Sequence, residues 1–90
     1  MKYEWDENKR RSNLLKHGFD FAFANLVLED PRSLTLDDIK HSTPDEKRMM
    51  TIGFFKDTVC VVVIHTARDK RIRIISFRHA NKKEEAMLWQ

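Results

Sequence analysis

The spacing of apolar and polar positions predicts two helices in the N-terminal third of the chain. Residues 7–17 follow Asp6, whose carboxylate can accept hydrogen bonds from the free amides of a first helical turn. Gly18 comes next and supplies the left-handed residue that commonly ends a helix. Apolar residues then recur at helical spacing over residues 21–29, and Pro31 ends that stretch. The pattern therefore predicts a tight helix pair.

Alternation over residues 33–37, and three strand-like stretches separated by short turns after residue 47, predict strands in most of the remaining chain. The last three strand stretches follow one another across short turns, as in an antiparallel meander. The connection over residues 38–47 is polar and is predicted to be a loop. Asn81, with Glu84 three positions later, is typical of the start of a helix, here over residues 82–89. The predicted strands are residues 3–5, 33–37, 48–54, 58–65 and 71–78.

This order of elements predicts a small α+β domain. The sheet is expected to be antiparallel, with the N-terminal helix pair and the C-terminal helix covering its apolar side on one face. Ninety residues are enough for one modest core, so residues 1–90 are expected to form a single domain. The pattern leaves open whether residues 3–5 join the sheet.

The distribution of charge adds a functional indication. Hydrophobic residues make up 41% of the chain, so we expect it to fold although 34% of its residues are charged. The net charge is only +3, but residues 19–46 hold seven acidic and two basic residues, whereas residues 68–83 hold seven basic and one acidic. Because a polyanion responds to local positive potential, the basic C-terminal third favours a nucleic acid as partner.

The sequence also argues against several kinds of protein. No apolar run reaches the roughly 18 to 20 residues that cross a bilayer, and the N-terminus has no signal-peptide core, so a soluble, cytoplasmic protein is expected. The one cysteine, Cys60, lies in the apolar run VCVVVI and is interpreted as a core thiol. The four histidines show no metal-ligand spacing, and two glycines cannot build a phosphate-cradling loop. No metal and no cofactor are therefore expected.

The pairing register of the last two strands decides what the basic residues can do. If His65 pairs with Arg71, then His65, Arg71 and Arg73 lie together on one face. A slip of one residue would place His65 beside Ile72 and the apolar core, with the arginines on the other face. We predict the first arrangement, in which His65 and Arg73 share a face.

In that register the cluster suits an RNA phosphate. Guanidinium groups can make paired contacts with phosphate oxygens, and an imidazole can exchange a proton near neutral pH. RNA transesterification needs little more than these groups and no metal. The alternative is that these residues form a basic surface that is merely exposed to solvent. Composition alone favours this alternative. The candidates are His65, Arg71, Arg73 and Arg78, with His79, Lys82 and Lys83 just beyond the strand; His17 and His41 are secondary candidates.

Residues spaced along nearly the entire chain carry a resemblance to a known family. The most specific parts are Lys16-His17-Gly18 and the segment from His65-Thr66 through RIRIIS to Arg78 and Ala80. In order and spacing these parts resemble the BrnT family of toxins. Further matching residues are Trp5-Asp6, Lys9, Asn13, Phe21, Ala24, Asp30-Pro31, His41-Ser42, Ile52-Gly53 and the stretch NKKE at residues 81–84.

The resemblance implies a RelE-like fold and a ribonuclease toxin of a type II toxin–antitoxin module, which cleaves RNA and arrests bacterial growth. It also implies neutralisation in a hetero-oligomer by a BrnA antitoxin, whose own DNA-binding domain would bring the complex to operator DNA; a toxin dimer stays an open alternative. The chain departs from many relatives at Ala67, where they carry an acidic residue, and at Trp89, near their tyrosine. The site residues implied are His17, His65, Arg73, Arg78, Lys82 and Lys83.

The working hypothesis is a metal-independent endoribonuclease. In it Arg73 and Arg78 stabilise phosphate charge and His65 acts as acid or base, while RNA is held by Arg71, His79, Lys82, Lys83 and His17. One alternative is a module that binds nucleic acid or an antitoxin without chemistry. The other is a structural interaction protein that docks a partner through the edge of the meander or the helix bearing Trp89.

Overall fold

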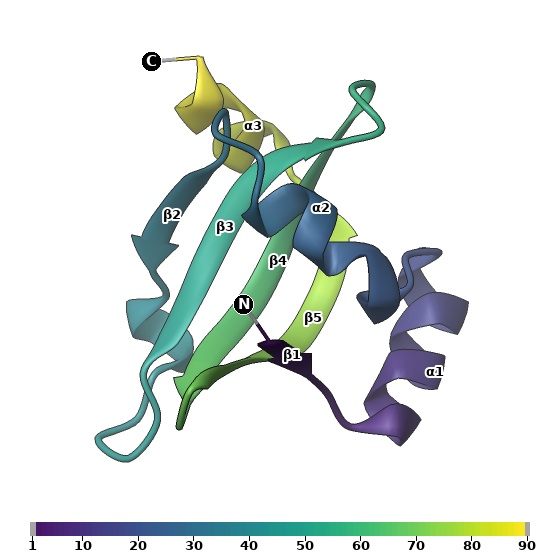
Figure 1. The fold of residues 1–90 in the computed structure, drawn as a ribbon. Coiled ribbons are helices and arrows are strands. Elements are labelled where there is room, and N and C mark those ends of the chain that lie inside the picture. Colours follow the sequence, from purple (N-terminus) through teal and green to yellow (C-terminus); the bar gives the residue numbers. More distant parts are fainter. Residues whose placement is uncertain (1, 90) are drawn as a thin grey trace.

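The computed structural model describes residues 2–89, and its centre is a five-stranded sheet in the order β1-β5-β4-β3-β2 (Figure 1). The strands are β1 (Lys2–Glu4), β2 (Leu34–Asp37), β3 (Arg48–Phe55), β4 (Val59–Arg68) and β5 (Arg71–His79). Strands β2 to β5 form the predicted antiparallel meander. Strand β1 joins the sheet but runs parallel to β5, so the sheet is mixed and the expectation of a purely antiparallel sheet was wrong. Alternation along one strand does not reveal the direction of a partner distant in sequence.

The helices begin where the capping residues predict. Helix α1 (Glu7–His17) follows Asp6, whose carboxylate accepts from the amides of Asn8 and Lys9, and Gly18 ends it with φ at 80°. The predicted second helix is divided into a 3₁₀ turn, η1 (Phe21–Phe23), and a short α2 (Ala24–Leu28). Helix α3 (Lys82–Leu88) begins with the predicted capping box of Asn81 and Glu84.

The helices cover both faces of the sheet rather than one. Helix α2 crosses one face (Figure 1), and together with Phe19 and η1 it encloses a core that includes Val61, Val63 and Phe77. On the other face, side chains of α3 pack on a second cluster formed by Ile52, Val62 and Ile64. The expected single covered face was therefore wrong. The physical reason is the unbroken apolar run of β4, whose residues 61–64 are all buried and so need cover on both sides.

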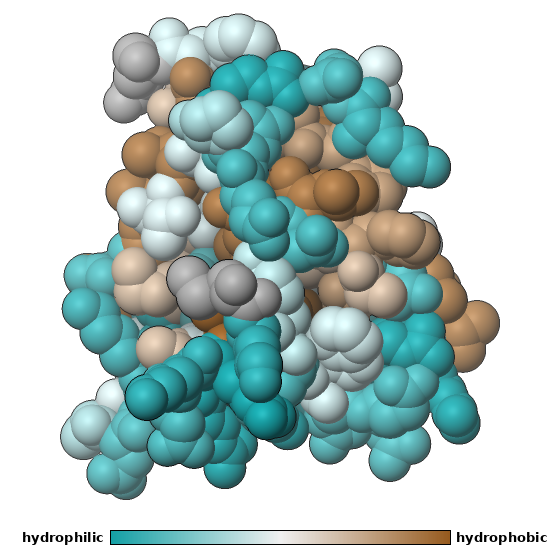
Figure 2. Space-filling view, viewed as in Figure 1, coloured by the Kyte–Doolittle hydropathy of each residue, from teal (hydrophilic) through white to brown (hydrophobic). Residues whose placement is uncertain are grey.

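The surface seen from the α2 side is divided by polarity. Figure 2 shows hydrophobic residues beside α2 and a hydrophilic lower end, where β4 turns into β5. Phe23 and Leu26 are both about half exposed on this side of the molecule. No helix within residues 2–89 is long and apolar enough to span a membrane.

The edge of β5 is completed by a side chain. Strand β1 pairs only with residues 71–73 of β5, which leaves the rest of that edge without a strand partner. Asn13 of α1 fills part of the gap: its amide nitrogen donates to the carbonyl oxygens of Phe77 (2.7 Å) and Phe19 (3.1 Å), and its oxygen accepts from the Phe77 amide (3.1 Å). Because Asn13 is buried, these bonds join α1 to the sheet in an environment without competing water.

Candidate functional site

A pocket of about 440 Å³ lies on the α3 side of the sheet, between β3, β5, α3 and the 3₁₀ turn η2 (Ile39–His41). Side chains on this face of β3 and β5 point toward the loop that precedes β3, and together with that loop they form the walls of the pocket. The ionisable residues that line it are Asp38, Lys40, His41, Arg48, Arg78 and Glu84, and the other lining residues are Met50, Ile64, Ile75 and Ser76.

Arg78 is held in the pocket by the first turn of α3. Its Nη1 and Nη2 donate to the two carboxylate oxygens of Glu84 at 2.8 and 2.9 Å, and Nη1 also donates to the carbonyl of His79 at 3.1 Å. The hydrogen bonds to Glu84, together with the charges of Glu84 and Asp38, raise the pKa of Arg78 above its usual value, and burial opposes this. Within residues 2–89 no acceptor bonds Nε. Arg78 therefore keeps one edge of its guanidinium for a ligand.

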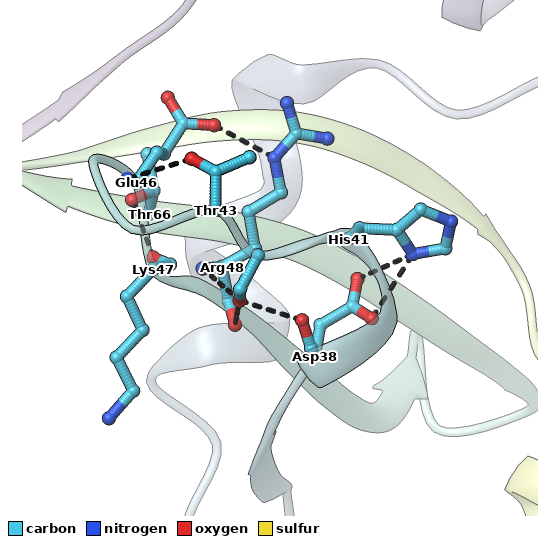
Figure 3. Close-up of polar contacts among 8 residues, drawn as sticks. Asp38, His41, Thr43, Glu46, Lys47, Arg48 and Thr66 are labelled. Carbon is cyan, nitrogen blue, oxygen red and sulfur yellow. Dashed lines mark hydrogen bonds and ion pairs between the residues drawn. The ribbon is translucent and has the colours of Figure 1, made fainter.

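Asp38 and His41 form a second fixed pair in the pocket. Nδ1 of His41 lies 3.1 and 3.0 Å from the two carboxylate oxygens of Asp38. The Asp38 side chain is 12% exposed and that of His41 is 60% exposed, so the carboxylate lies beneath an accessible imidazole. Figure 3 shows the imidazole with its other nitrogen pointing away from Asp38.

The segment from Asp38 to Arg48 is held by main-chain contacts, although the pattern predicted only a polar loop. The amide of Asp38 donates to the carbonyl of Arg48 at 2.9 Å. Ser42 Oγ donates to the carbonyl of Asp38 at 2.7 Å and accepts from the amide of Arg48 at 2.9 Å. Thr43 and Glu46 form a β-bridge beyond it. These bonds fix the pair of Asp38 and His41 relative to β3.

Arg48 adds a second arginine to the pocket. It lies at the start of β3, and its Nε donates to Glu46 at 2.8 Å (Figure 3). Its side chain is about one-third exposed, so the ion pair is partly open to solvent. A phosphate oxygen would meet Arg48 and Arg78 on the same side of the sheet, because both line this pocket.

The predicted juxtaposition of His65 and Arg73 was wrong. Val63 pairs with Phe77 rather than with Arg73, its partner in the first register, and a bulge between Ile64 and His65 then shifts the pairing by one residue. His65 then pairs with Ile74, and Arg73 pairs with Thr66. Since neighbouring residues of a strand point to opposite faces, His65 points into the α2 side and Arg73 to the other. Because β5 has one extra residue at the bulge, its side chains from there toward Arg71 point to the face opposite to the one that the first register predicts.

His65 lies in the core. It is 8% exposed, and its Nε2 is 2.8 Å from Thr51 Oγ1, which in turn lies 2.7 Å from Thr35 Oγ1. Burial lowers the pKa of His65 below its usual 6.5. The structure therefore places this histidine in a buried polar chain between strands, away from the pocket.

The stability of the fold should depend on pH through His65. Because its folded pKa is depressed, the folded state favours the neutral ring; that contribution is complete above about pH 6.5 and is lost as pH falls through the folded pKa. We expect the free energy of unfolding to decrease as pH is lowered from about 7 to about 5. Urea denaturation at several pH values should show a shallower decrease in His65→Asn than in the wild type, and equal slopes would contradict the assignment.

The other predicted arginines lie at the lower end of the sheet. Arg73 donates to Glu4 of β1 at 2.7 Å, and Arg71 lies 4.0 Å from the same carboxylate. Arg71 also lines a separate depression with Lys2, Asp69 and Lys70. The structure does not bring Arg71 and Arg73 into the pocket that holds Arg78.

The remaining predicted residues lie around the upper end of β5. His79 packs edge-on against Phe19, with ring centroids 4.8 Å apart, and Lys82 and Lys83 are exposed at the start of α3. His17 lines a small groove with Lys9 and Lys16. Partial burial, with the charges of Lys16, Arg78 and His79, lowers the pKa of His17, so these groups are near neighbours of one another.

Sequence reasoning missed most of the pocket. Asp38 and Arg48 were not candidates at all, and His41 was only a secondary candidate in a predicted loop. The spacing of Asp38 and His41, three positions apart, brings their side chains together only because η2 forms a 3₁₀ turn there. The pair His41-Ser42 among the matching family residues was the one sequence signal that pointed to this segment.

Comparison with known proteins identifies the family of this chain. The family model described as "Ribonuclease toxin, BrnT, of type II toxin-antitoxin system" matches residues 5–84. The crystal structure of the Brucella abortus ribonuclease toxin BrnT is similar to this chain at 32% identity and a TM-score of 0.69, over 91% of this chain and 99% of that one. The comparison with curated proteins found no match. The chain therefore belongs to the BrnT family of ribonuclease toxins of type II toxin–antitoxin systems.

Proposed function

We propose that this chain is a metal-independent endoribonuclease that cleaves RNA in the cytoplasm and arrests bacterial growth. The observation that carries the proposal is the pocket that Arg48 and Arg78 both line, in a member of a ribonuclease toxin family. A BrnA-type antitoxin with its own DNA-binding domain would neutralise the chain in a hetero-oligomer, and operator DNA would be reached only through that antitoxin.

The proposed site stabilises charge on phosphorus with arginine. The Nε edge of Arg78 can donate to a phosphate oxygen while Glu84 holds the opposite edge. Donors fixed before substrate arrives stabilise the charge of the transition state at little cost in reorganisation. Among the residues predicted from sequence, Arg78 is thus the one that we propose contacts the scissile phosphate.

The other predicted residues keep less direct roles in the proposal. Lys82 and Lys83 are exposed in the first turn of α3 and would hold the RNA backbone by charge, with His79 and His17 near Arg78. Catalytic roles for His65 and Arg73, and RNA binding by Arg71, stay predictions from sequence. Alanine variants at these three positions test them in the cleavage assay below.

The test is cleavage of RNA by the purified chain in the presence of EDTA. We expect products with 2′,3′-cyclic phosphate and 5′-hydroxyl ends at a rate that EDTA leaves unchanged, because arginine and an acid–base side chain supply the chemistry. Addition of the cognate antitoxin should stop cleavage. Growth arrest by the chain expressed alone, relieved by the antitoxin, is the cellular counterpart. Activity that EDTA abolishes and Mg²⁺ restores would contradict metal independence.

One observation favours a second candidate function. Each arginine of the pocket already pairs with a carboxylate, Arg78 with Glu84 and Arg48 with Glu46, so the pocket could bind a polyanion without reacting with it. In that case RNA binds with a steep salt dependence but stays intact after long incubation. Intact RNA at saturating protein would therefore favour a binding module over an enzyme.

A further inference from the structure

We propose that His41, oriented by Asp38, is the acid–base residue of the pocket and removes the proton from the ribose 2′-hydroxyl. This inference rests on the ribonuclease function proposed above and adds the group that moves the proton. It assigns that role to the loop before β3 rather than to His65 of β4.

The hydrogen bond to Asp38 selects the useful form of the imidazole. A carboxylate can only accept, so Nδ1 of His41, at 3.0 and 3.1 Å from its oxygens, carries the hydrogen. In the neutral ring Nε2 is then a free acceptor. Among residues 2–89 nothing bonds Nε2, and the exposed ring leaves it open to a substrate hydroxyl.

Asp38 is fixed well enough to act as a positioning residue. Its amide donates to the carbonyl of Arg48, and its carbonyl accepts from Ser42 Oγ at 2.7 Å and from the Ser42 amide at 3.1 Å. These bonds join η2 to the first residue of β3 (Figure 3). The imidazole is thus oriented by a side chain whose own backbone is held at both ends.

The location of His41 distinguishes it from the other histidines. It is the histidine that lines the same pocket as Arg78, whereas His65 is buried on the opposite face and its Nε2 already bonds Thr51. A general base has to reach the proton that it removes, and arginine has to reach the same phosphate. His41 and Arg78 line one cavity, so both can face the same phosphodiester without rearrangement of the core.

The charges around His41 come from four of the segments that line the pocket, while β4 contributes only Ile64. Asp38 and Lys40 lie on its own segment, Arg48 on β3, Arg78 on β5 and Glu84 on α3. Glu84 and Asp38 balance the two arginines, so the imidazole is not surrounded by cations alone.

The proton and bond changes of the step balance. Nε2 of His41 takes the proton of the 2′-hydroxyl, and the 2′-oxygen forms a bond to phosphorus. The bond from phosphorus to the 5′-oxygen breaks, and the leaving oxygen takes a proton from solvent water. The products are a 2′,3′-cyclic phosphate and a 5′-hydroxyl, and the imidazolium returns its proton to the resulting hydroxide.

The experiment compares RNA cleavage and RNA binding in His41→Asn, Asp38→Asn and the control Asp37→Asn. Asp37 is the neighbouring carboxylate, 51% exposed and paired with Lys47 on the surface. We expect His41→Asn to lower kcat by about 100-fold to 10,000-fold and to leave the Kd for RNA within about threefold of the wild type. Added imidazole should restore part of the activity of His41→Ala.

Asp38→Asn should lower kcat less and change the pH–rate profile. The side-chain amide of the variant can donate a hydrogen bond to Nδ1, which favours the tautomer with the hydrogen on Nε2. In that tautomer Nε2 cannot act as a base. A purely structural role for Asp38 would lower activity equally at all pH values. Asp37→Asn should match the wild type in both kcat and pH profile.

The outcomes separate this inference from the function on which it rests. If the wild type leaves RNA intact, the ribonuclease proposal fails and the role of His41 fails with it. If the wild type cleaves RNA and His41→Asn cleaves it at an unchanged rate with an unchanged pH profile, the role of His41 is overturned while the ribonuclease function stands. Should His41→Asn fail to fold, the pH profile of Asp38→Asn against Asp37→Asn decides.

Discussion

Arg78→Ala should reduce kcat/KM for RNA cleavage by about 100-fold or more, the effect of removing a fixed donor from a developing oxyanion. The loss has two sources. The free edge of the guanidinium no longer meets the phosphate, and Glu84, whose side chain is only 12% exposed, loses its cation and repels the substrate. Cleavage of a labelled RNA by the purified variant measures the effect.

Two further variants show whether the loss is specific. Arg78→Lys keeps the charge but not the planar fork, so we expect an intermediate activity. Arg32→Ala removes an exposed arginine that pairs with Asp30 and Asp57 outside the pocket, and it should leave cleavage unchanged. Equal activities in Arg78→Ala and Arg32→Ala would place the phosphate elsewhere. Circular dichroism should show a folded Arg78 variant, since Asn81 and Glu84 still cap α3.

Asn13→Ala should lower the free energy of unfolding by about 3 kcal/mol, because it removes the polar side chain that completes the β5 edge. The variant leaves the amide of Phe77 and the carbonyl oxygens of Phe77 and Phe19 without these bonds in a buried location. A buried group without a partner costs its full desolvation free energy, so the loss exceeds that of a surface hydrogen bond. Urea denaturation of the purified variant measures it.

The control for this prediction lies on the same helix. Asn8→Ala replaces an exposed asparagine of α1 and should change stability by no more than about 0.5 kcal/mol. Asn13→Asp keeps an acceptor for the Phe77 amide but turns carboxylate oxygens toward two carbonyls, so it should be destabilising as well. A loss in Asn13→Ala no larger than that in Asn8→Ala would show that the edge of β5 needs no such partner.

Both predictions depend on contacts between segments that the sequence pattern does not connect. Arg78 was a candidate from its place in a basic stretch, but its pairing with Glu84 required the direction in which α3 leaves the sheet. Asn13 was noted only as part of a family resemblance. Its role follows from β1 being too short to cover the edge of β5.

The local chemistry of the chain determined its elements. Asp6 and Gly18 fixed the ends of α1, and Asn81 with Glu84 fixed the start of α3, because each cap satisfies backbone groups within a few residues. Alternation located β2, and runs of strand-forming residues separated by short turns located β3, β4 and β5. The basic C-terminal third and the family resemblance indicated RNA from the sequence alone.

Only the tertiary structure decided which residues meet. A bulge of one residue in β5 separated His65 from Arg73, and a 3₁₀ turn brought His41 to Asp38 beside Arg78. The physical reason is that a site depends on register and on the direction of chain segments distant in sequence. The register and the direction of these segments are set by the packing of both faces of the sheet. Propensities and caps, in contrast, act only between near neighbours along the chain.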